Sequence, residues 1–458
     1  MPVVLMYFIY SLLLSLGFLA LLPRFLVDAF RHGKYVAGFC ERLGTLSQLS
    51  RNGRPVVWVH CVSVGEAQAA RPLIRGIKER FPDYLIAVST ITRTGQILAR
   101  DIFKNEAARV FYFPLDWRWV VRRVLKTVKP NAVLVMETEL WPNFLHECKQ
   151  QRIPVVLVNG RLSEQSFRRY RLIKVFMTRV LSSLTLASMQ TAADANRIRA
   201  LGMRRDRILI TGNLKFDAGT KPTTDSVTTE FRNRFSLTGE SRLILAASTH
   251  DPEEVIILNS FRQVLSRSQL KPRLMIAPRH PERFREVEDL VKASGLRWVR
   301  RSAPLTAADQ AAEVILMDSI GELHSVYSLA SLVVVGGSMA KTGGHNILEP
   351  AAAGVPVIVG PYTHNFQSIV ETFVKAGAIV QLPPLPDSAM IVELANAISE
   401  LLFDPAKRAE LASLARKLVQ ENGGATERTL RALDSILSIK AEATETVGST
   451  GAGNVSIA

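Results

Sequence analysis

Short apolar runs alternate with longer stretches of helical periodicity along most of the chain. In the first half the runs are rich in β-branched residues and bounded by polar or glycine positions. They lie at residues 55–64, 85–89, 110–113, 132–136, 154–158 and 185–188. Runs of this kind predict β-strands, and the stretches between most of them predict helices. The alternation therefore predicts a parallel sheet that helices cover on both faces.

The pattern weakens over residues 212–238, which are mostly polar and contain Pro222 and several threonines, and then restarts. The later strand candidates are residues 243–247, 273–277, 297–299, 314–317, 332–335 and 356–359. We therefore expect an α/β protein with two doubly wound, Rossmann-like domains. The predicted organisation is an N-terminal segment at 1–46, a first domain at 47–215, a linker at 216–240, a second domain at 241–440 and a disordered tail at 441–458. Such sheets bind ligands at the carboxyl ends of their strands, so the active site is expected in a cleft between the two facing domains.

The N-terminal segment contains a long uncharged run. Val3–Leu22 is 20 residues without a charge, which as a helix covers about 30 Å, the thickness of a bilayer's hydrocarbon layer. Basic residues follow the run and none precedes it, which predicts that the rest of the chain is cytoplasmic. A cleaved signal peptide is the alternative, but the run is too long, its front is uncharged, and Leu21-Leu22-Pro23-Arg24 is a poor cleavage site. We expect a retained membrane anchor; whether it spans the bilayer stays open.

Charge adds a second constraint. The 458 residues include 57 Lys+Arg and 41 Asp+Glu, a net charge of +16. This excess predicts an anionic partner, which is a nucleic acid, an anionic membrane or a phosphorylated substrate. Nucleic acid is disfavoured because the basic residues are dispersed, without an aromatic-interleaved motif.

Metal chemistry has no sequence signal. Cys40, Cys61 and Cys148 are far apart and form neither a CxxC motif nor a Cys/His cluster, so neither a disulfide framework nor a zinc site is indicated. No D-x-D motif occurs either. We expect no bound metal.

A glycine-rich segment in the second half predicts a nucleotide pocket. A strand ends in Gly336-Gly337, a second pair follows at 343–344, and a short helix comes next. Glycines let backbone amides approach a ligand, and a helix N-terminus favours phosphate. Asn346 and Glu349 also have capping-box spacing, so a purely structural role is the alternative. The ends of two other strands supply further candidates, which gives the predicted set Pro278, Arg279, Ile320, Gly321, Glu322, Asn346, Ile347, Leu348 and Glu349.

Carboxylates follow two strands in the first half. Glu66 comes after a strand and a glycine, at the start of a predicted helix. The helix dipole alone would lower its pKa, whereas a general base needs burial or a neighbouring carboxylate. Glu137 and Glu139 follow another strand and share a face if the chain is extended there. They are predicted to support Glu66 or an acceptor hydroxyl; two solvated loop acids are the alternative.

Seven segments occur in an order that identifies a family. They are VSVGEAQAARPLI, METELWPN, VNGRLSE, GNLKFD, STHDPEE, APRHPERF and GGHNILEP. Together, over roughly residues 20–435, they resemble the 3-deoxy-D-manno-octulosonic acid (Kdo) transferase family of lipopolysaccharide biosynthesis. The last segment also resembles the donor-binding signature of GT-B glycosyltransferases.

The resemblance implies a GT-B fold and an inverting, metal-independent transfer of Kdo from CMP-Kdo, the donor substrate, with no cofactor. It implies that Glu66 is the general base, that Glu349 binds the donor ribose, that Arg279 binds the phosphate, and that the backbone of 320–322 helps to hold the nucleotide. The implied acceptor is the lipid A precursor on the cytoplasmic side of the inner membrane. One departure is Ile347, where members often carry proline.

Basic residues after the fifth strand are candidates for the acceptor phosphates: Arg161, Arg168, Arg169 and Arg171. A solvated basic helix face is the alternative. Two other functions stay open, which are a GT-B transferase with a UDP-sugar donor and a membrane lipid acceptor, and a non-catalytic binding protein. The presence of Glu66 disfavours the second. The sequence does not encode how many Kdo residues are added.

Overall fold

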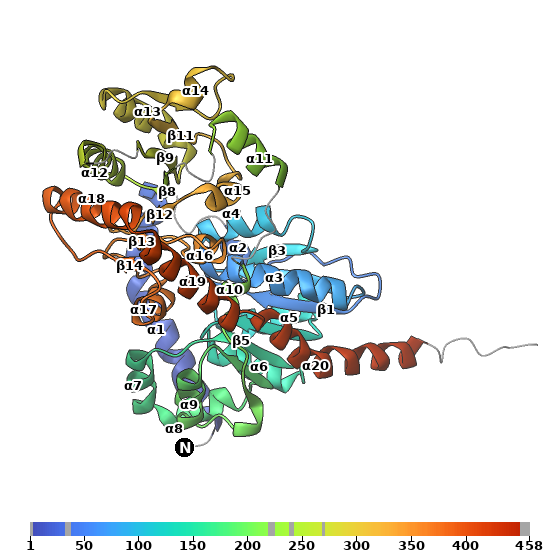
Figure 1. The fold of residues 1–458 in the computed structure, drawn as a ribbon. Coiled ribbons are helices and arrows are strands. Elements are labelled where there is room, and N and C mark those ends of the chain that lie inside the picture. The colour runs from blue at the N-terminus through green and yellow to red at the C-terminus, as the bar shows by residue number, and fades with distance from the viewer. Residues whose placement is uncertain (1–2, 33–37, 219–224, 238–241, 268–270, 449–458) are drawn as a thin grey trace, which may run out of the picture. The chain divides into compact units, whose positions relative to one another are not determined.

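The structure is a computed structural model that describes residues 3–32, 38–218, 225–237, 242–267 and 271–448 (Figure 1). The chain divides into two compact units, which we describe one at a time. Unit 1 comprises Met1–Ala218 and Gly423–Ala458, and unit 2 comprises Gly219–Asn422. Each unit is built on a seven-stranded sheet in which the paired strands are parallel. The predicted fold class, two parallel α/β sheets preceded by an apolar helix, is confirmed.

The sheet of unit 1 has the strand order β3-β2-β1-β4-β5-β6-β7, which is doubly wound about β1. Its strands are β1 (Val56–His60), β2 (Leu85–Thr90), β3 (Arg109–Tyr112), β4 (Ala132–Met136), β5 (Val155–Gly160), β6 (Leu186–Met189) and β7 (Ile208–Ile210). Its helices are α1 (Val3–His32), α2 (Phe39–Arg42), α3 (Val64–Arg80), α4 (Arg93–Ile102), α5 (Arg118–Val128), α6 (Pro142–Gln150), α7 (Glu164–Leu172), α8 (Lys174–Leu181), α9 (Ala192–Ala200), α10 (Lys215–Ala218) and α20 (Ala425–Gly448).

Residues of β1 explain why this sheet is covered on both faces. All five side chains of the strand are buried. Val56 and Trp58 join a hydrophobic cluster on one face, and Val57 and Val59 join a second cluster on the other. Because successive side chains of a strand point to opposite faces, an apolar strand of this length requires helices on both sides.

The sheet of unit 2 has the strand order β10-β11-β9-β8-β12-β13-β14. Its strands are β8 (Leu243–Thr249), β9 (Arg273–Pro278), β10 (Trp298–Arg300), β11 (Val314–Leu316), β12 (Leu332–Val335), β13 (Val357–Val359) and β14 (Val380–Gln381). Its helices are α11 (Asp225–Arg234), α12 (Glu253–Arg267), α13 (Phe284–Ala293), α14 (Ala308–Ala311), α15 (Leu323–Val326), α16 (Leu348–Ala352), α17 (Gln367–Lys375), α18 (Asp387–Phe403) and α19 (Pro405–Asn422).

The segment predicted as a linker contains ordered structure. Helix α11 lies within residues 216–240 and belongs to unit 2. Phe231 and Phe235 are fully buried there, and Arg234 forms a buried ion pair with Asp309, with 2.7 Å between Nε and Oδ2. The segment is mostly polar in sequence, so Phe231 in the helix and Phe235 just after it were not recognised as buried residues.

The C-terminal helix α20 departs from the predicted boundaries. The sequence predicted one domain over 241–440 and a disordered tail from 441, but the chain from Gly423 clusters with unit 1, and α20 extends to Gly448. Leu433 and Leu437 are fully buried against the first domain. The hydroxyl of Tyr84 donates to the carbonyl oxygen of Leu437 over 2.7 Å. Helical periodicity alone does not reveal which core an apolar stripe joins.

The first helix matches the predicted anchor in length and composition. Within the described residues, one helical segment, Val4–Arg24, is long and apolar enough to cross a membrane. Residues 33–37 of the predicted N-terminal segment lie outside the described residues.

Candidate functional site

Glu66 lies at the carboxyl end of β1, in the first turn of α3. Ser63 caps this helix, and its side-chain oxygen accepts a hydrogen bond from the Glu66 amide. The Glu66 carboxylate turns back over the cap. Its Oε2 accepts from the Val62 amide over 2.8 Å, and its Oε1 accepts from the Ser63 hydroxyl over 3.0 Å. The residue is 7% exposed. Two hydrogen bonds thus hold a nearly buried carboxylate in one orientation.

The surroundings of Glu66 favour proton uptake. Burial, followed by the negative charge of Glu137 and a smaller effect of Glu139, raises its pKa to about 7, against the hydrogen bonds from Val62 and Ser63. A position at a helix N-terminus predicts the opposite direction. Desolvation outweighs the dipole here because the carboxylate is enclosed rather than solvated. A base with a pKa near 7 takes up and releases protons readily at neutral pH.

The carboxylates after β4 do not have the expected extended geometry. The chain turns at Glu137, whose φ of 53° is left-handed. The assumption of a shared face is therefore wrong, because a turn breaks the two-residue alternation. Both residues still act on the site electrostatically. Burial, and then the charge of Glu137, raises the pKa of Glu139, and both charges raise that of Glu66.

Lys215 is a neighbour of these carboxylates that the sequence did not single out. Its Nζ lies 3.5 Å from Glu137 Oε1, and both side chains are mostly buried. The preceding residue, Leu214, donates its amide to the side chain of Asn159 over 3.0 Å. The VNGRLSE and GNLKFD segments therefore meet beside the METELWPN segment. The order of the motifs along the sequence indicated that they belong to one family, but it did not show that Lys215 lies close to Glu137.

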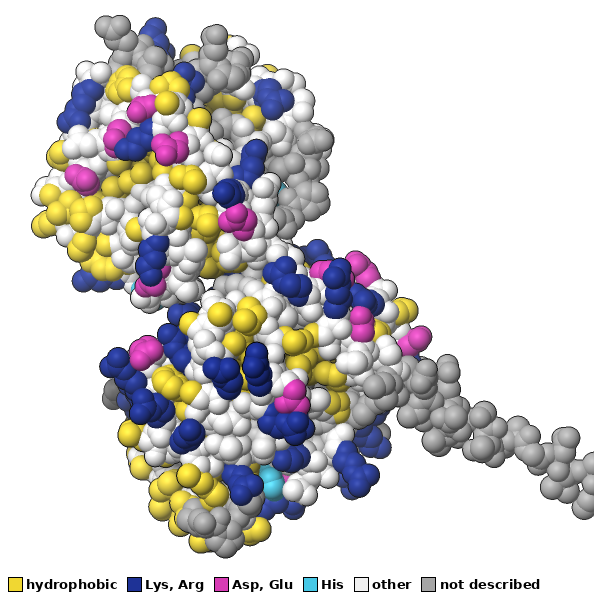
Figure 2. All heavy atoms as spheres, turned by 60° about the horizontal axis from the view of Figure 1, so that its bottom comes forward, with side chains coloured by type: hydrophobic (Ala, Val, Ile, Leu, Met, Phe, Trp, Pro, Cys, Tyr) yellow, Lys and Arg dark blue, Asp and Glu magenta, His cyan; other side chains and the backbone are white. Residues whose placement is uncertain are grey.

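The four candidate arginines lie after β5. Arg161 is half-buried, and its carbonyl oxygen accepts from the Thr138 hydroxyl. Arg168, Arg169 and Arg171 are exposed on α7, which has no buried residue. Arg168 forms an ion pair with Glu164 at 3.3 Å. On the face of unit 1 that Figure 2 shows, basic side chains outnumber acidic ones. An acceptor role for these arginines stays a prediction.

In unit 2, the glycine-rich loop after β12 is organised by a buried carboxylate. Glu253, at the start of α12, accepts hydrogen bonds from the amides of Gly337, Met339 and Ala340 over 2.7, 2.8 and 3.1 Å. A Cβ on Gly336 would lie 2.4 Å from the Ser248 carbonyl oxygen, so glycine is required there. The expectation that the amides of this loop face a ligand is therefore wrong for these three, because Glu253 already binds them.

Three histidines lie together near this loop. The Nε2 atoms of His250 and His345 are 2.7 Å apart with their rings stacked, and the ring of His280 packs edge-on against His250 at a centroid distance of 5.1 Å. Burial, and then the proximity of His250, Arg279 and His280, lowers the pKa of His345 to about 3. At this pKa the His345 imidazole is neutral at pH 7 and can form a hydrogen bond with His250 through the facing nitrogens. None of these histidines was among the predicted site residues.

Two of the predicted donor-binding residues are Arg279, which lies near these histidines, and Glu349, which lies in α16. Arg279 is exposed after β9 and close enough to affect the pKa of His345. Glu349 accepts from the Asn346 side chain over 3.2 Å, and its Oε2 lies 3.9 Å from His324 Nδ1. The reciprocal capping box is not formed, although Asn346 also accepts from the Leu348 amide over 3.0 Å.

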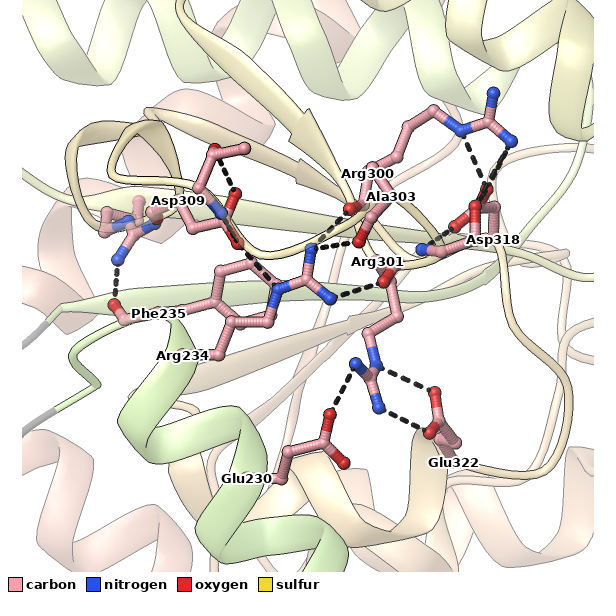
Figure 3. Close-up of polar contacts among 12 residues, drawn as sticks. Glu230, Arg234, Phe235, Arg300, Arg301, Ala303, Asp309, Asp318 and Glu322 are labelled. Carbon is pink, nitrogen blue, oxygen red and sulfur yellow. Dashed lines mark hydrogen bonds and ion pairs between the residues drawn. The ribbon is translucent and has the colours of Figure 1, made fainter.

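The remaining donor candidates differ in what they expose. Pro278, Ile347 and Leu348 are buried, so their side chains are not accessible to a ligand. Ile320 is 76% exposed beside Gly321. The Glu322 carboxylate is held by the Arg301 guanidinium through two hydrogen bonds of 3.1 and 2.8 Å, within the arginine-rich network of Figure 3. This pairing fixes the loop before α15 but occupies the Glu322 side chain.

Metal ligands are not grouped in the described ranges. No set of three or more His, Cys, Asp or Glu side chains there is arranged to hold a metal ion.

Known proteins share both the sequence and the fold. The family model described as 3-deoxy-D-manno-octulosonic-acid transferase (kdotransferase) matches residues 37–218. The 3-deoxy-D-manno-octulosonic acid transferase of Haemophilus influenzae is 35% identical over 405 residues, which cover 88% of this chain and 92% of that protein. The protein of the same name from Bordetella pertussis is 33% identical and covers 83% of this chain and 87% of its own.

A solved structure supports the fold alone. The putative UDP-N-acetylglucosamine 2-epimerase of Listeria monocytogenes superposes with a TM-score of 0.54 at 16% identity, covering 84% of this chain and 97% of that one. Both transferases exceed 30% identity, and each match covers more than 80% of this chain and of the relative. The chain therefore belongs to the 3-deoxy-D-manno-octulosonic acid transferase family.

Proposed function

We propose that this chain, which by its family is a glycosyltransferase that transfers Kdo in lipopolysaccharide biosynthesis, moves Kdo from CMP-Kdo to a hydroxyl of the lipid A precursor, with Glu66 as the general base. The observation that carries this proposal is the buried carboxylate of Glu66, held by Val62 and Ser63 and with a pKa of about 7. A carboxylate in this state accepts a proton near neutral pH far better than a solvated glutamate does.

In the proposed reaction, Glu66 takes the proton of the acceptor hydroxyl as its oxygen attacks the anomeric carbon of Kdo. The new carbon–oxygen bond forms on the face opposite CMP, the bond to the phosphate breaks, and CMP leaves with the electron pair. One displacement inverts the anomeric centre, so neither an enzyme nucleophile nor a cofactor is required. Glu137, paired with Lys215, keeps a negative charge near Glu66 that favours its protonated state after transfer.

We assign donor binding to unit 2. Arg279 is exposed after β9 and suits the CMP phosphate, because a guanidinium forms charge-assisted bonds with phosphate oxygens. Glu349 is oriented by Asn346 and suits a ribose hydroxyl. Three amides of the glycine-rich loop are bound to Glu253, so the charge on departing CMP is balanced mainly by side chains rather than by that loop.

The acceptor assignment places the enzyme at the cytoplasmic face of the inner membrane. The apolar segment Val4–Arg24 supports anchoring, and the excess of basic residues suits acceptor phosphates and anionic lipids. Arg161 and the three arginines of α7 are the candidates for phosphate contact. Reversal of charge at Arg168, Arg169 and Arg171 is expected to raise the acceptor KM; an unchanged KM contradicts their role. Arg199→Glu/Arg205→Glu, on exposed positions of the same unit, is the control.

The experiment combines a mass assay with a binding assay. The full-length chain is incubated with lipid A precursor and a source of CMP-Kdo, and the mass increments on the lipid count the Kdo residues added. Glu66→Gln is expected to lower turnover at least ~100-fold, the usual size of general-base catalysis, while CMP binding by calorimetry is unchanged. Near-normal turnover of that variant contradicts the assignment of the base. Inhibition by UDP rather than CMP favours the alternative of a UDP-sugar donor.

A further inference from the structure

The few polar side chains of the N-terminal helix lie on one side of it. Between Val4 and Arg24 the polar residues are Tyr7, Tyr10, Ser11 and Ser15. Their spacings of three and four residues put them on a single helical face. Burial follows the same period, since the enclosed or partly enclosed positions are 6, 7, 10, 11, 14, 15, 18 and 22. A segment that looks uniformly apolar by composition is therefore two-sided.

The polar face is docked on the body of unit 1. The Tyr10 hydroxyl donates to Asp116 Oδ2 over 2.9 Å, and the Asn143 side-chain amide donates to Ser11 Oγ over 3.0 Å. The Trp117 indole donates to Ser15 Oγ over 3.1 Å. Three hydrogen bonds along the helix thus join it to the start of α5 and the start of α6.

Aromatic packing extends this contact at both ends. Tyr7 is 2% exposed, and its ring lies 4.2 Å from that of His146 in α6. The Phe18 ring packs edge-on against Trp117 at 5.0 Å. Phe176 of α8 contacts the rings of both Tyr7 and Tyr10. Residues 7–18 therefore lie along the protein over about 16 Å of helix, at a rise of about 1.5 Å per residue.

The opposite face is exposed and wholly apolar. It presents Val4, Leu5, Phe8, Ile9, Leu12, Leu13, Leu16, Leu19 and Leu21. A soluble monomer rarely exposes a continuous apolar surface of this kind. Leu172, Ile173 and Val175 are also exposed at the α7–α8 junction, beside Phe176 and next to the basic residues of α7. Apolar side chains beside basic ones suit the boundary between the acyl chains and anionic headgroups of a bilayer.

Charged residues next to the docking face argue against a helix that crosses the bilayer. Arg118 and Arg122 both pair with Glu147 at 2.7 Å, on the helices that hold α1. If α1 crossed the membrane while docked, this partly exposed ion network would enter the hydrocarbon layer, where ionised side chains are strongly disfavoured. If it left the domain to cross, its serines and tyrosines would lose their partners, and the Asp116 carboxylate would lose one of its donors.

We propose that α1 lies in the plane of the cytoplasmic leaflet, with its polar face docked on α5 and α6, its apolar face in the lipid, and its N-terminus on the cytoplasmic side. This rests on the proposed membrane location, and it adds the orientation of the anchor. An in-plane helix fixed to the domain holds unit 1, and with it Glu66, against the surface that carries the acceptor. A spanning helix on a mobile tether would not set that orientation.

The first test is the side of the membrane on which the N-terminus lies. A short protease-cleavable tag is placed before Met1 of the full-length chain, expressed in a Gram-negative host. Cleavage in inverted membrane vesicles but not in intact spheroplasts is the expected result. Cleavage in intact spheroplasts shows a spanning helix and overturns the proposal. A chain found only in the soluble fraction, with the apolar face buried in a dimer, also overturns it.

The second test measures docking in the membrane. In a Cys40→Ser background, Ser11→Cys/Asn143→Cys is expected to form an intramolecular disulfide in native membranes, because the two side chains are in contact. Leu12→Cys/Asn143→Cys, with one cysteine on the exposed face, is the control and is expected not to do so. Equal cross-linking of both pairs, or of neither, contradicts docking. Because Asn143 is buried, the tag experiment keeps the proposal testable if these variants fold poorly.

The two proposals fail in different ways. Kdo transfer is measured in detergent on the protein with an unmodified α1, so the absence of any transfer contradicts the proposed function. An N-terminus on the outer side contradicts only the in-plane anchor.

Discussion

Replacing the proposed base should stabilise the protein at the expense of its activity. Glu66 is 7% exposed, and its pKa rises from the usual 4.5 to about 7 through burial and then through Glu137. Between these two values the folded state holds a proton on Glu66 that the unfolded chain has released. The free energy of unfolding therefore falls as pH rises through this window. At about 1.4 kcal/mol per pKa unit, the full loss is ~3 kcal/mol above neutral pH.

Glu66→Gln removes this cost because the amide carries no charge. We expect it to raise the free energy of unfolding by up to ~3 kcal/mol at pH 8, with a gain that shrinks to below ~1 kcal/mol at pH 5. For a domain of this size, each kcal/mol raises Tm by roughly 2–4 °C, so the full gain of ~3 kcal/mol should raise the Tm of the variant by ~6–12 °C at pH 8. Gln donates where Glu accepts, and imperfect hydrogen bonds to Val62 and Ser63 would reduce the gain.

The assay is thermal unfolding of the full-length protein in detergent at pH 5 and pH 8. Glu79→Gln, on the exposed side of the same helix, is the control and should change Tm little and equally at both pH values. A Glu66→Gln variant that is no more stable than the parent at pH 8, or whose gain does not shrink on acidification, refutes the argument from burial and neighbouring charge. A gain in stability together with loss of Kdo transfer would identify Glu66 as a destabilising residue retained for function.

Three further predictions follow from named contacts. The kcat/KM of the parent should rise with pH through about 7 as Glu66 ionises. Glu137→Gln should move this rise to lower pH, because it removes a charge that raises the pKa of Glu66. A pH–rate profile that does not move would show that Glu137 does not act on the base. Arg279→Ala should weaken CMP binding ~10- to 100-fold by calorimetry, as expected for loss of a charge-assisted contact, while Arg285→Ala, an exposed position nearby, should not. Leu433→Ala should lower the free energy of unfolding by ~3 kcal/mol, because it opens a cavity between α20 and the first domain, and Leu433→Met should cost far less; equal losses would argue against a packed position.

Much of the candidate site was accessible from sequence because short strands of a parallel sheet end at predictable places. Glu66 and the carboxylates after β4 were identified as residues at two strand ends, and the structure shows that these strands, β1 and β4, are adjacent in the sheet. Lys215 was not found, because it approaches Glu137 from a distant segment after β7. The role of Glu253 was also missed, since a glutamate at a helix start normally indicates a cap rather than a carboxylate that binds the loop of another strand.

The sequence by itself determined what depends on local periodicity and composition. Apolar runs specified six of the seven strands in each sheet and the N-terminal apolar helix, but not β7 or β14. The ordered motifs specified the family. Tertiary structure decided the properties that depend on contacts between residues far apart in the sequence. It raised rather than lowered the pKa of Glu66, because desolvation and carboxylates from another strand outweigh the local helix dipole.

The same distinction holds for the two terminal helices. Both are evident as helices in the sequence, but only packing shows that α20 returns to unit 1 and that α1 docks through its serines and tyrosines. Helical periodicity determines which residues share a face. It does not determine which surface that face meets, because the partner residues lie more than a hundred positions away along the chain.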